Sequence, residues 1–368
     1  MDFDLTEEQQ LLRDVTREVV SRNFDITGYN EVVEGDTGWR RDVWKQLGET
    51  GILGLGFDPD ESGPIEVMVV MTEIGRRLAP EPVAAAALIP GALIAGLGSD
   101  AQKQALDDVA SGTTLLAFAH TEPGVRFSSG ELNTRAEQSG DGWTVTGRKN
   151  PVLAGDSADK IIVSAALPDG GAGLFIVDAE AATRHPYRTF DGRRGAQVDF
   201  AAATAEPLGD GEDASEHIAG AVIRHQSALC GEALGAMEEA LRLTTEYLPS
   251  RKQFGVPLSN FQTLTQRAAD MYVSLELARS MTYYAAMALA DGQFDPVIAA
   301  RAKLQVGRSG RHIAQEAIQL HGGIGMTAEY PVGHYAARLT AIDNTLGTAD
   351  DHVRFLAPRV GDYEIVAL

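Results

Sequence analysis

The succession of three stretches with different hydrophobic periodicity most constrains what this chain can fold into. Apolar residues recur at helical spacing over about residues 5–112, and short alternating runs separated by Gly and Asp turns fill about 115–206. Long helical patterns return from about residue 214. Helices, then strands, then a helical bundle predict an α+β chain, which we divide into domains at 1–113, 114–212 and 213–368.

Individual elements follow from the same patterns. Thr6 and Gln9 are spaced as an N-terminal capping box for the first helix. Further helices are predicted at 41–53, 66–78, 84–97, 101–110, 217–248, 260–291, 296–320 and 348–356. Strands are predicted at 143–147, 160–164 and 174–177, within an antiparallel middle domain.

The charge balance excludes some classes of partner. With 31 Lys and Arg against 52 Asp and Glu, the net charge is −21, which disfavours nucleic acid and anionic membranes. The His residues are scattered, so we predict no metal site. The single Cys230 lies in an apolar run and is predicted to be a buried thiol. Without a secretory signal or a membrane-spanning run, a cytoplasmic location is expected.

Two segments carry side chains suited to a dinucleotide. Around Arg251, the chain reads Arg-Lys-Gln-Phe-Gly, and Phe261-Gln262 follows shortly after. Further on stand Gln319 to Gly325 and then Tyr330-Pro331-Val332. A guanidinium can grip a diphosphate with two hydrogen bonds, and amides can donate or accept. A salt-bridged surface Arg, a core Phe and a helix-ending Gly pair are the alternative interpretations of the same residues.

These segments, taken together and in order, resemble the flavin-dependent acyl-CoA dehydrogenases, and the resemblance covers nearly the whole chain. It implies an N-terminal helical domain, a middle antiparallel β domain and a C-terminal four-helix bundle. It also implies FAD as the cofactor, with the ADP portion of a neighbouring subunit's flavin bound in trans. The residues that the resemblance assigns to this role are Arg251, Gln253, Phe254, Gln262, Gln319, Gly322 and Gly323.

The segments that would hold this chain's own flavin depart from the family pattern. Where the family has Thr-Glu-Pro-x-Ala-Gly-Ser-Asp, this chain has Arg126 and Phe127 in place of Gly and Ser. Where the family has Gly-x-Lys-x-Trp-Ile-Thr, Pro151 replaces the Trp and Leu153 replaces the Thr. The resemblance therefore implies a damaged cis cradle, although Thr121 and Thr348 remain.

The family's catalytic Glu is missing from both of its usual positions. The position immediately before the Gly347-Thr348 pair holds Leu346, and the alternative position holds His225. A His can act as a base near neutral pH, and Glu232 or Asp343 could be proposed as unorthodox bases. We therefore predict no catalytic residue in this chain.

One arrangement accounts for these departures together. The chain would be the non-catalytic subunit of an α2β2 acyl-CoA dehydrogenase, contributing trans contacts to FAD while a homologous partner supplies the Glu. The resemblance to actinobacterial enzymes implies desaturation of a bulky steroid side-chain acyl-CoA, with electrons passed to an electron-transfer flavoprotein. The alternatives are a self-sufficient homotetramer using His225 or Asp343, a non-enzymatic flavin- or CoA-binding relative, and a DNA-binding relative that the net charge disfavours.

Overall fold

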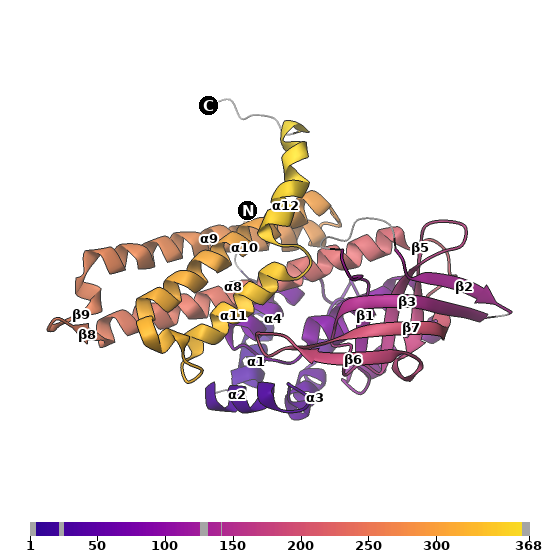
Figure 1. Cartoon of the computed structure of the whole chain (residues 1–368), viewed down its shortest axis with the longest axis horizontal. Helices are drawn as coiled ribbons and strands as arrows, with labels where there is room; N and C mark the ends of the chain where they lie inside the picture. The colour runs from indigo at the N-terminus through magenta and orange to yellow at the C-terminus, as the bar shows by residue number, and fades with distance from the viewer. Residues whose placement is uncertain (1–4, 22–25, 126–131, 141, 363–368) are drawn as a thin grey trace.

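The computed structural model describes residues 5–21, 26–125, 132–140 and 142–362. In Figure 1 the strands gather at one end of the molecule and the long C-terminal helices run along its longest axis toward the other. The N-terminal helices lie alongside both, and α12 stands out from the body. This arrangement confirms the predicted order of helices, strands and helical bundle. No helix within the described ranges is both long enough and apolar enough to cross a membrane.

The N-terminal lobe is helical throughout. Its α-helices are α1 (Glu7–Ser21), α2 (Ile26–Glu34), α3 (Arg41–Glu49), α4 (Pro64–Arg76), α5 (Ile89–Leu97), α6 (Asp100–Lys103) and α7 (Leu106–Ala110). A 3-10 turn, Ile52–Gly54, follows α3, and a π-helical segment, Ala84–Leu88, leads into α5. The capping box is confirmed: Gln9 donates its backbone N–H to the Thr6 hydroxyl at 3.2 Å, and Thr6 donates to the Gln9 side chain at 3.1 Å. Helix α2 was not predicted.

The middle lobe is a seven-stranded sheet. Its strands are β1 (Leu116–Ala119), β2 (Arg135–Ser139), β3 (Gly142–Leu153), β4 (Lys160–Ala166), β5 (Ala172–Asp178), β6 (Thr183–Arg188) and β7 (Arg194–Pro207). Because β5 pairs with both β4 and β7, the path β4-β2-β3-β7-β5 closes on itself around a core that includes Phe175 and Phe200. Most pairings are antiparallel, as predicted, but β1 and β2 each pair with β4 in parallel, which the sequence did not indicate.

The C-terminal lobe is built on four long helices. These are α8 (Ser215–Ser250), α9 (Gln262–Ala290), α10 (Pro296–His321) and α11 (Pro331–Asn344). A two-stranded hairpin, β8 (Lys252–Gln253) and β9 (Val256–Pro257), and a 3-10 turn, Leu258–Asn260, join α8 to α9. The turn Gly322–Met326 follows α10, and α12 (Ala349–Leu356) with the turn Ala357–Asp362 ends the described chain. Cys230 is fully buried in α8, as predicted, and burial raises the pKa of its thiol to about 12.

Helices α4 and α8 cross at very short range, and two glycines make this possible. A Cβ added to Gly75 would lie 1.8 Å from the carbonyl oxygen of Glu232, and one added to Gly235 would lie 1.8 Å from that of Thr72. Any side chain at either glycine would therefore force the helices apart. The crossing fixes α8, which lines the central cavity, against the N-terminal lobe.

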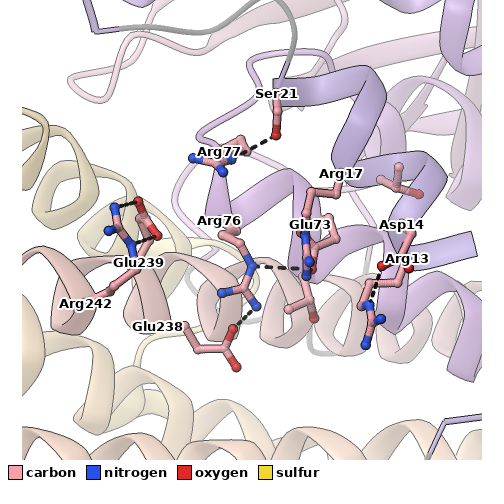
Figure 2. A network of polar contacts seen from close by, with 12 residues as sticks. Arg13, Asp14, Arg17, Ser21, Glu73, Arg76, Arg77, Glu238, Glu239 and Arg242 are labelled. Carbon is pink, nitrogen blue, oxygen red and sulfur yellow. Dashed lines mark hydrogen bonds and ion pairs between the residues drawn. The ribbon is translucent and has the colours of Figure 1, made fainter. Parts of the chain in front are cut away.

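An ion-pair network reinforces the same contact (Figure 2). The Glu73 side chain on α4 is only 1% exposed and accepts hydrogen bonds from Arg17 of α1 at 2.9 and 3.0 Å. Arg76 bridges Glu73, at 3.3 Å, and Glu238 of α8. Three helices from two lobes are thereby joined through charged groups whose partners compensate for the loss of water.

Candidate functional site

A cavity of about 670 Å³ lies where the three lobes meet. Its walls come from the π-helical segment and α5, from the ends of β1 and β3, and from α8, α10, α11 and α12. A volume of this size is typical of cofactor and substrate sites, and junctions between domains are where such sites commonly form.

Both positions at which the family would carry its Glu line this cavity. Leu346 lies in the α11–α12 connection and His225 lies in the first half of α8. The side-chain amide of Gln226 donates a hydrogen bond to the Leu346 carbonyl at 2.9 Å, which ties the two segments together. Leu346 has a φ of 55°, in the left-handed region that Leu rarely occupies. The structure thus brings together two sequence positions that lie 121 residues apart, and neither offers a carboxylate.

His225 is uncharged at neutral pH. Burial lowers the pKa of its imidazole to about 4, and the nearby Lys303 ammonium acts in the same direction. Lys303 is itself 1% exposed and donates to the Ile342 carbonyl at 2.6 Å. A neutral imidazole with so low a pKa is a weak proton acceptor, which counts against His225 as the base.

Asp343 lines the cavity but its carboxylate is already engaged. One oxygen accepts a hydrogen bond from Arg311 at 3.0 Å, and the other accepts from the backbone N–H of Ala349 at 3.0 Å. These contacts hold the end of α11 against the start of α12. The side chain therefore has a structural role in closing the loop that carries Leu346.

The Glu232 carboxylate is also fully engaged in ion pairs. Its carboxylate, 3% exposed, receives two hydrogen bonds from Arg338 at 2.7 and 2.8 Å and one from Arg193 at 3.3 Å. Arg338 also pairs with Asp191 at 2.9 Å. Although burial alone would raise it, the two guanidinium groups hold the pKa of Glu232 below its ordinary value. We call Asp191, Arg193, Glu232 and Arg338 the junction cluster, because they come from the β6–β7 connection, α8 and α11.

The β side of the cavity is apolar where the family pattern has Trp and Thr. Pro151 and Leu153, both on β3, line the cavity, so no hydroxyl is present at the second position. Thr121 also lines it, and Thr348 lines it while its hydroxyl is used in a capping box with Asp351. Arg126 and Phe127 lie outside the described residues.

His120 is a cavity residue that the sequence analysis missed. Its Nδ1 lies 2.9 Å from the Ser164 hydroxyl, and its ring stacks on Phe118 at 5.6 Å between centroids. Burial, with a smaller effect of the Lys149 ammonium, lowers the pKa of His120 to about 4. Its position directly before Thr121 was the available signal, since Thr121 itself was singled out.

The seven residues assigned to trans flavin contacts lie elsewhere, at the end of the helical bundle. They sit at the α8–α9 connection and at the end of α10, and none of them lines the central cavity. Stacking of Tyr247 on His321, with 4.5 Å between ring centroids, joins these two places. All seven are exposed, and Phe254 is 93% exposed.

The chemistry of this second group fits an anionic dinucleotide. In the described part of the chain no carboxylate pairs with the Arg251 guanidinium, and the Gln319 amide has no hydrogen-bond partner. Gly322 has a φ of 68°, which favours glycine, and open space surrounds the position of its absent Cβ. An exposed guanidinium beside amides and bare backbone suits a diphosphate approaching from outside the chain.

Comparison with known proteins agrees with this geometry. Residues 6–113 match the N-terminal domain, and residues 223–361 the C-terminal domain, of acyl-CoA dehydrogenases. The chain belongs to the acyl-CoA dehydrogenase family, whose members are FAD-dependent oxidoreductases acting on CH–CH bonds.

Particular relatives span most of its length. A probable acyl-CoA dehydrogenase of Bacillus subtilis, YngJ, is 29% identical over 90% of this chain and 92% of its own. Among solved structures, the Tcur3481–Tcur3483 steroid acyl-CoA dehydrogenase is 28% identical with a TM-score of 0.88, covering 97% of this chain and 98% of that one. The ChsE4–ChsE5 complex from Mycobacterium tuberculosis is 25% identical with a TM-score of 0.89, covering 99% of this chain and 100% of that one. These comparisons confirm the predicted fold and FAD as the cofactor.

Proposed function

We propose that this chain is the non-catalytic subunit of a heteromeric, FAD-dependent acyl-CoA dehydrogenase. It would contribute Arg251, Phe254 and Gln319 to a flavin held mainly by a homologous partner, which supplies the Glu. The observation that supports this proposal is the cavity in which the two expected base positions hold Leu346, which has no proton acceptor, and His225, whose imidazole is a weak one.

The reaction assigned to the complex is α,β-desaturation of an acyl-CoA thioester. FAD, when bound, supplies the acceptor for the hydride that leaves the β-carbon. A partner carboxylate would remove the α-proton, and this chain's exposed guanidinium and amides would bind and orient the flavin's diphosphate. Electrons would then leave through an electron-transfer flavoprotein.

A steroid side-chain thioester is the proposed substrate. Support comes from the similarity to a steroid acyl-CoA dehydrogenase made of two named chains, and to a second two-chain complex. An α2β2 assembly with one flavin per heterodimer would follow, since each heterodimer would contain one intact cradle and one damaged cradle.

The competing function is a self-sufficient enzyme with an unusual base. The contacts of Asp343 with Arg311 and Ala349, and those of Glu232 within the junction cluster, leave both carboxylates occupied. The low pKa of His225 counts against the third candidate. A DNA-binding relative is disfavoured by the net charge of −21.

The FAD-to-chain ratio decides between these functions. The chain is purified alone and after co-expression with a homologous acyl-CoA dehydrogenase chain, and flavin is measured by absorbance. The proposal predicts a ratio near zero for the chain alone and about one flavin per heterodimer for the pair. A ratio near one for the chain alone would refute the proposal and support the alternative, a self-sufficient enzyme.

A further inference from the structure

A side chamber of about 70 Å³ adjoins the central cavity. Ala85, Leu153 and His225 line both spaces, so the chamber lies next to the cavity, beside the π-helical segment, β3 and α8. The chamber also borders the junction cluster, because Arg193, Glu232 and Arg338 line it. We use the name side chamber for this space throughout.

Buried polar atoms without partners surround the side chamber. Glu81, 2% exposed, accepts a hydrogen bond from the Arg40 backbone N–H at 3.2 Å through Oε1. Its other oxygen, Oε2, has no hydrogen-bond partner among the described residues. The same holds for Asp156 Oδ1, Arg193 Nε and Arg194 Nε, and all four residues line the chamber.

Such atoms are rare in folded proteins because each one costs about 1–3 kcal/mol when its hydration is lost without replacement. Four of them around one small space indicate that something else completes their hydrogen bonds. Two are carboxyl oxygens, on Glu81 and Asp156, and two are donors on guanidinium groups. A partner for all four must accept from the guanidinium groups and donate to the Asp156 oxygen, so it must both donate and accept.

The charges around the side chamber balance. The carboxylates are those of Asp156, Glu232 and Asp191, the last of which pairs with Arg338, and the guanidinium groups are those of Arg193, Arg194 and Arg338. Glu81 adds little charge, because burial raises the pKa of its carboxyl to about 7. Arg193 also donates to the Ala79 carbonyl at 2.5 Å, and Arg194 to the Gly35 carbonyl, so both are anchored. A balanced set gives no net attraction for an ion, so it favours a neutral group, and a hydroxyl is the smallest neutral group that donates and accepts.

Two of the three residues shared by the central cavity and the side chamber, Ala85 and Leu153, are apolar, and the third is His225. Ile89, Phe118 and Leu153 line the central cavity, whereas Arg311 and Arg354 lie among its polar lining residues. An elongated ligand that is polar at both ends and apolar between them matches this distribution.

We propose that the side chamber binds a hydroxyl group at the far end of an apolar acyl chain whose body lies in the central cavity, with Glu81 as its principal hydrogen-bond partner. This inference goes beyond the proposed function, because it concerns what this chain's own cavity accepts. It identifies the ligand class as ω-hydroxylated acyl groups.

Matched ligands test the proposal on the unaltered full-length chain. Binding of octanoyl-, decanoyl- and dodecanoyl-CoA is compared by calorimetry with binding of their ω-hydroxy counterparts. For at least one chain length, the hydroxylated thioester is expected to bind about tenfold more tightly, the effect of one buried hydrogen bond. Equal affinities at every length, or no binding of either series, would overturn the proposal. Equal affinities would mean that water fills the chamber, which has room for about two molecules.

Substitutions of Glu81 test whether this side chain causes the preference for the hydroxylated thioester. Glu81→Leu should remove the tenfold preference for the hydroxylated over the unsubstituted thioester, and Glu81→Gln should retain part of it. Glu73→Gln replaces an equally buried carboxylate outside the chamber and should leave the preference intact. A preference that survives Glu81→Leu would also overturn the assignment.

The outcome is independent of the proposed function. Flavin content of the co-expressed pair reports on the trans contacts at the end of the bundle, which lie outside both the central cavity and the side chamber. The proposed subunit role can therefore be refuted while hydroxyl binding in the side chamber is supported, and the reverse is equally possible.

Discussion

The Gln226 side chain and the Leu346 main chain are joined by a 2.9 Å hydrogen bond across the central cavity wall. The bond holds the loop before α12 against α8, next to His225. This loop is therefore held in a fixed position in the cavity wall, and the side chain that it carries there is the isobutyl group of Leu346.

Arg251→Ala is expected to remove most of the FAD from the co-expressed complex. The change takes away an exposed guanidinium that has no ion pair in the described chain, so folding of this chain should not suffer. Flavin absorbance per heterodimer and the melting temperature measure the two effects. Arg188→Ala, at an exposed position on β6, is the matched control and should keep its flavin. Full flavin content in the Arg251 variant would disprove the trans assignment.

Leu346→Glu in this chain alone should not produce dehydrogenase activity. The new carboxylate would stand at the family position, but Pro151 and Leu153 still line the cavity where the flavin cradle needs other side chains. Turnover of an acyl-CoA with an artificial electron acceptor is the assay. Measurable turnover above the unaltered chain would show that the cis cradle is functional.

His225→Asn and Asp343→Asn should leave the desaturation rate of the complex within about twofold, because neither residue is the base. His225 is a weak proton acceptor, because burial lowers the pKa of its imidazole to about 4, and Asp343 closes the α11–α12 loop. Asp343→Asn keeps one oxygen for the Ala349 N–H, so the loop should survive. Loss of activity by a factor of about a hundred or more in either variant, with flavin content unchanged, would identify a base in this chain.

Glu232→Ala is expected to destabilise the chain by roughly 3–5 kcal/mol, since it leaves the Arg338 and Arg193 guanidinium groups buried with fewer partners. Denaturant unfolding of the variant and the unaltered chain gives the difference. Glu246→Ala removes an equally direct pair, with Arg242, whose side chains are 62% and 47% exposed, and should cost only about 0–1 kcal/mol. Similar costs for the two variants would contradict the structural role given to the junction cluster.

Stability should depend on pH through Glu81. Burial raises the pKa of this carboxyl from 4.5 to about 7, so the folded chain keeps a proton that the unfolded chain has already released. The contribution of this group is fully present below about pH 4.5 and is lost as the pH rises through about 7, a change of about 3 kcal/mol. The free energy of unfolding of the unaltered chain, minus that of Glu81→Gln, should fall over this interval. Because Asp156, Glu232 and His225 are common to both proteins, their titration cancels, and a flat difference would show that Glu81 is not protonated in the folded state.

Sequence periodicity predicted the long helices well, because each buries a face of regularly spaced apolar residues. The predicted helix 296–320 coincides with α10, Pro296–His321. Helix α11 was missed although Val332, Tyr335, Ala336 and Leu339 are buried at helical spacing. Its starting segment had been interpreted only as a motif, so a usable signal was overlooked.

Pairing between distant segments was beyond what periodicity can provide. Alternation identifies β4 but says nothing about its neighbours, and the parallel partner β1 begins 44 residues before it. The side chamber depends on Glu81, Asp156, Arg193 and Glu232 meeting from four separate elements. The convergence of positions 225 and 346 was anticipated only through the family resemblance, because no local spacing connects them.

The exposed ring of Phe254 has a consequence for how variants of this protein are screened. With 93% of its surface in solvent and an edge contact to Phe261 at 6.2 Å between ring centroids, it adds almost nothing to the chain's own folding free energy. A thermal-denaturation screen of the isolated chain would score truncation of the ring, as in Phe254→Ala, as nearly neutral. Selection for heat resistance would therefore not retain the Phe254 ring. Only a measurement of assembly with the partner chain would detect that the ring had been lost.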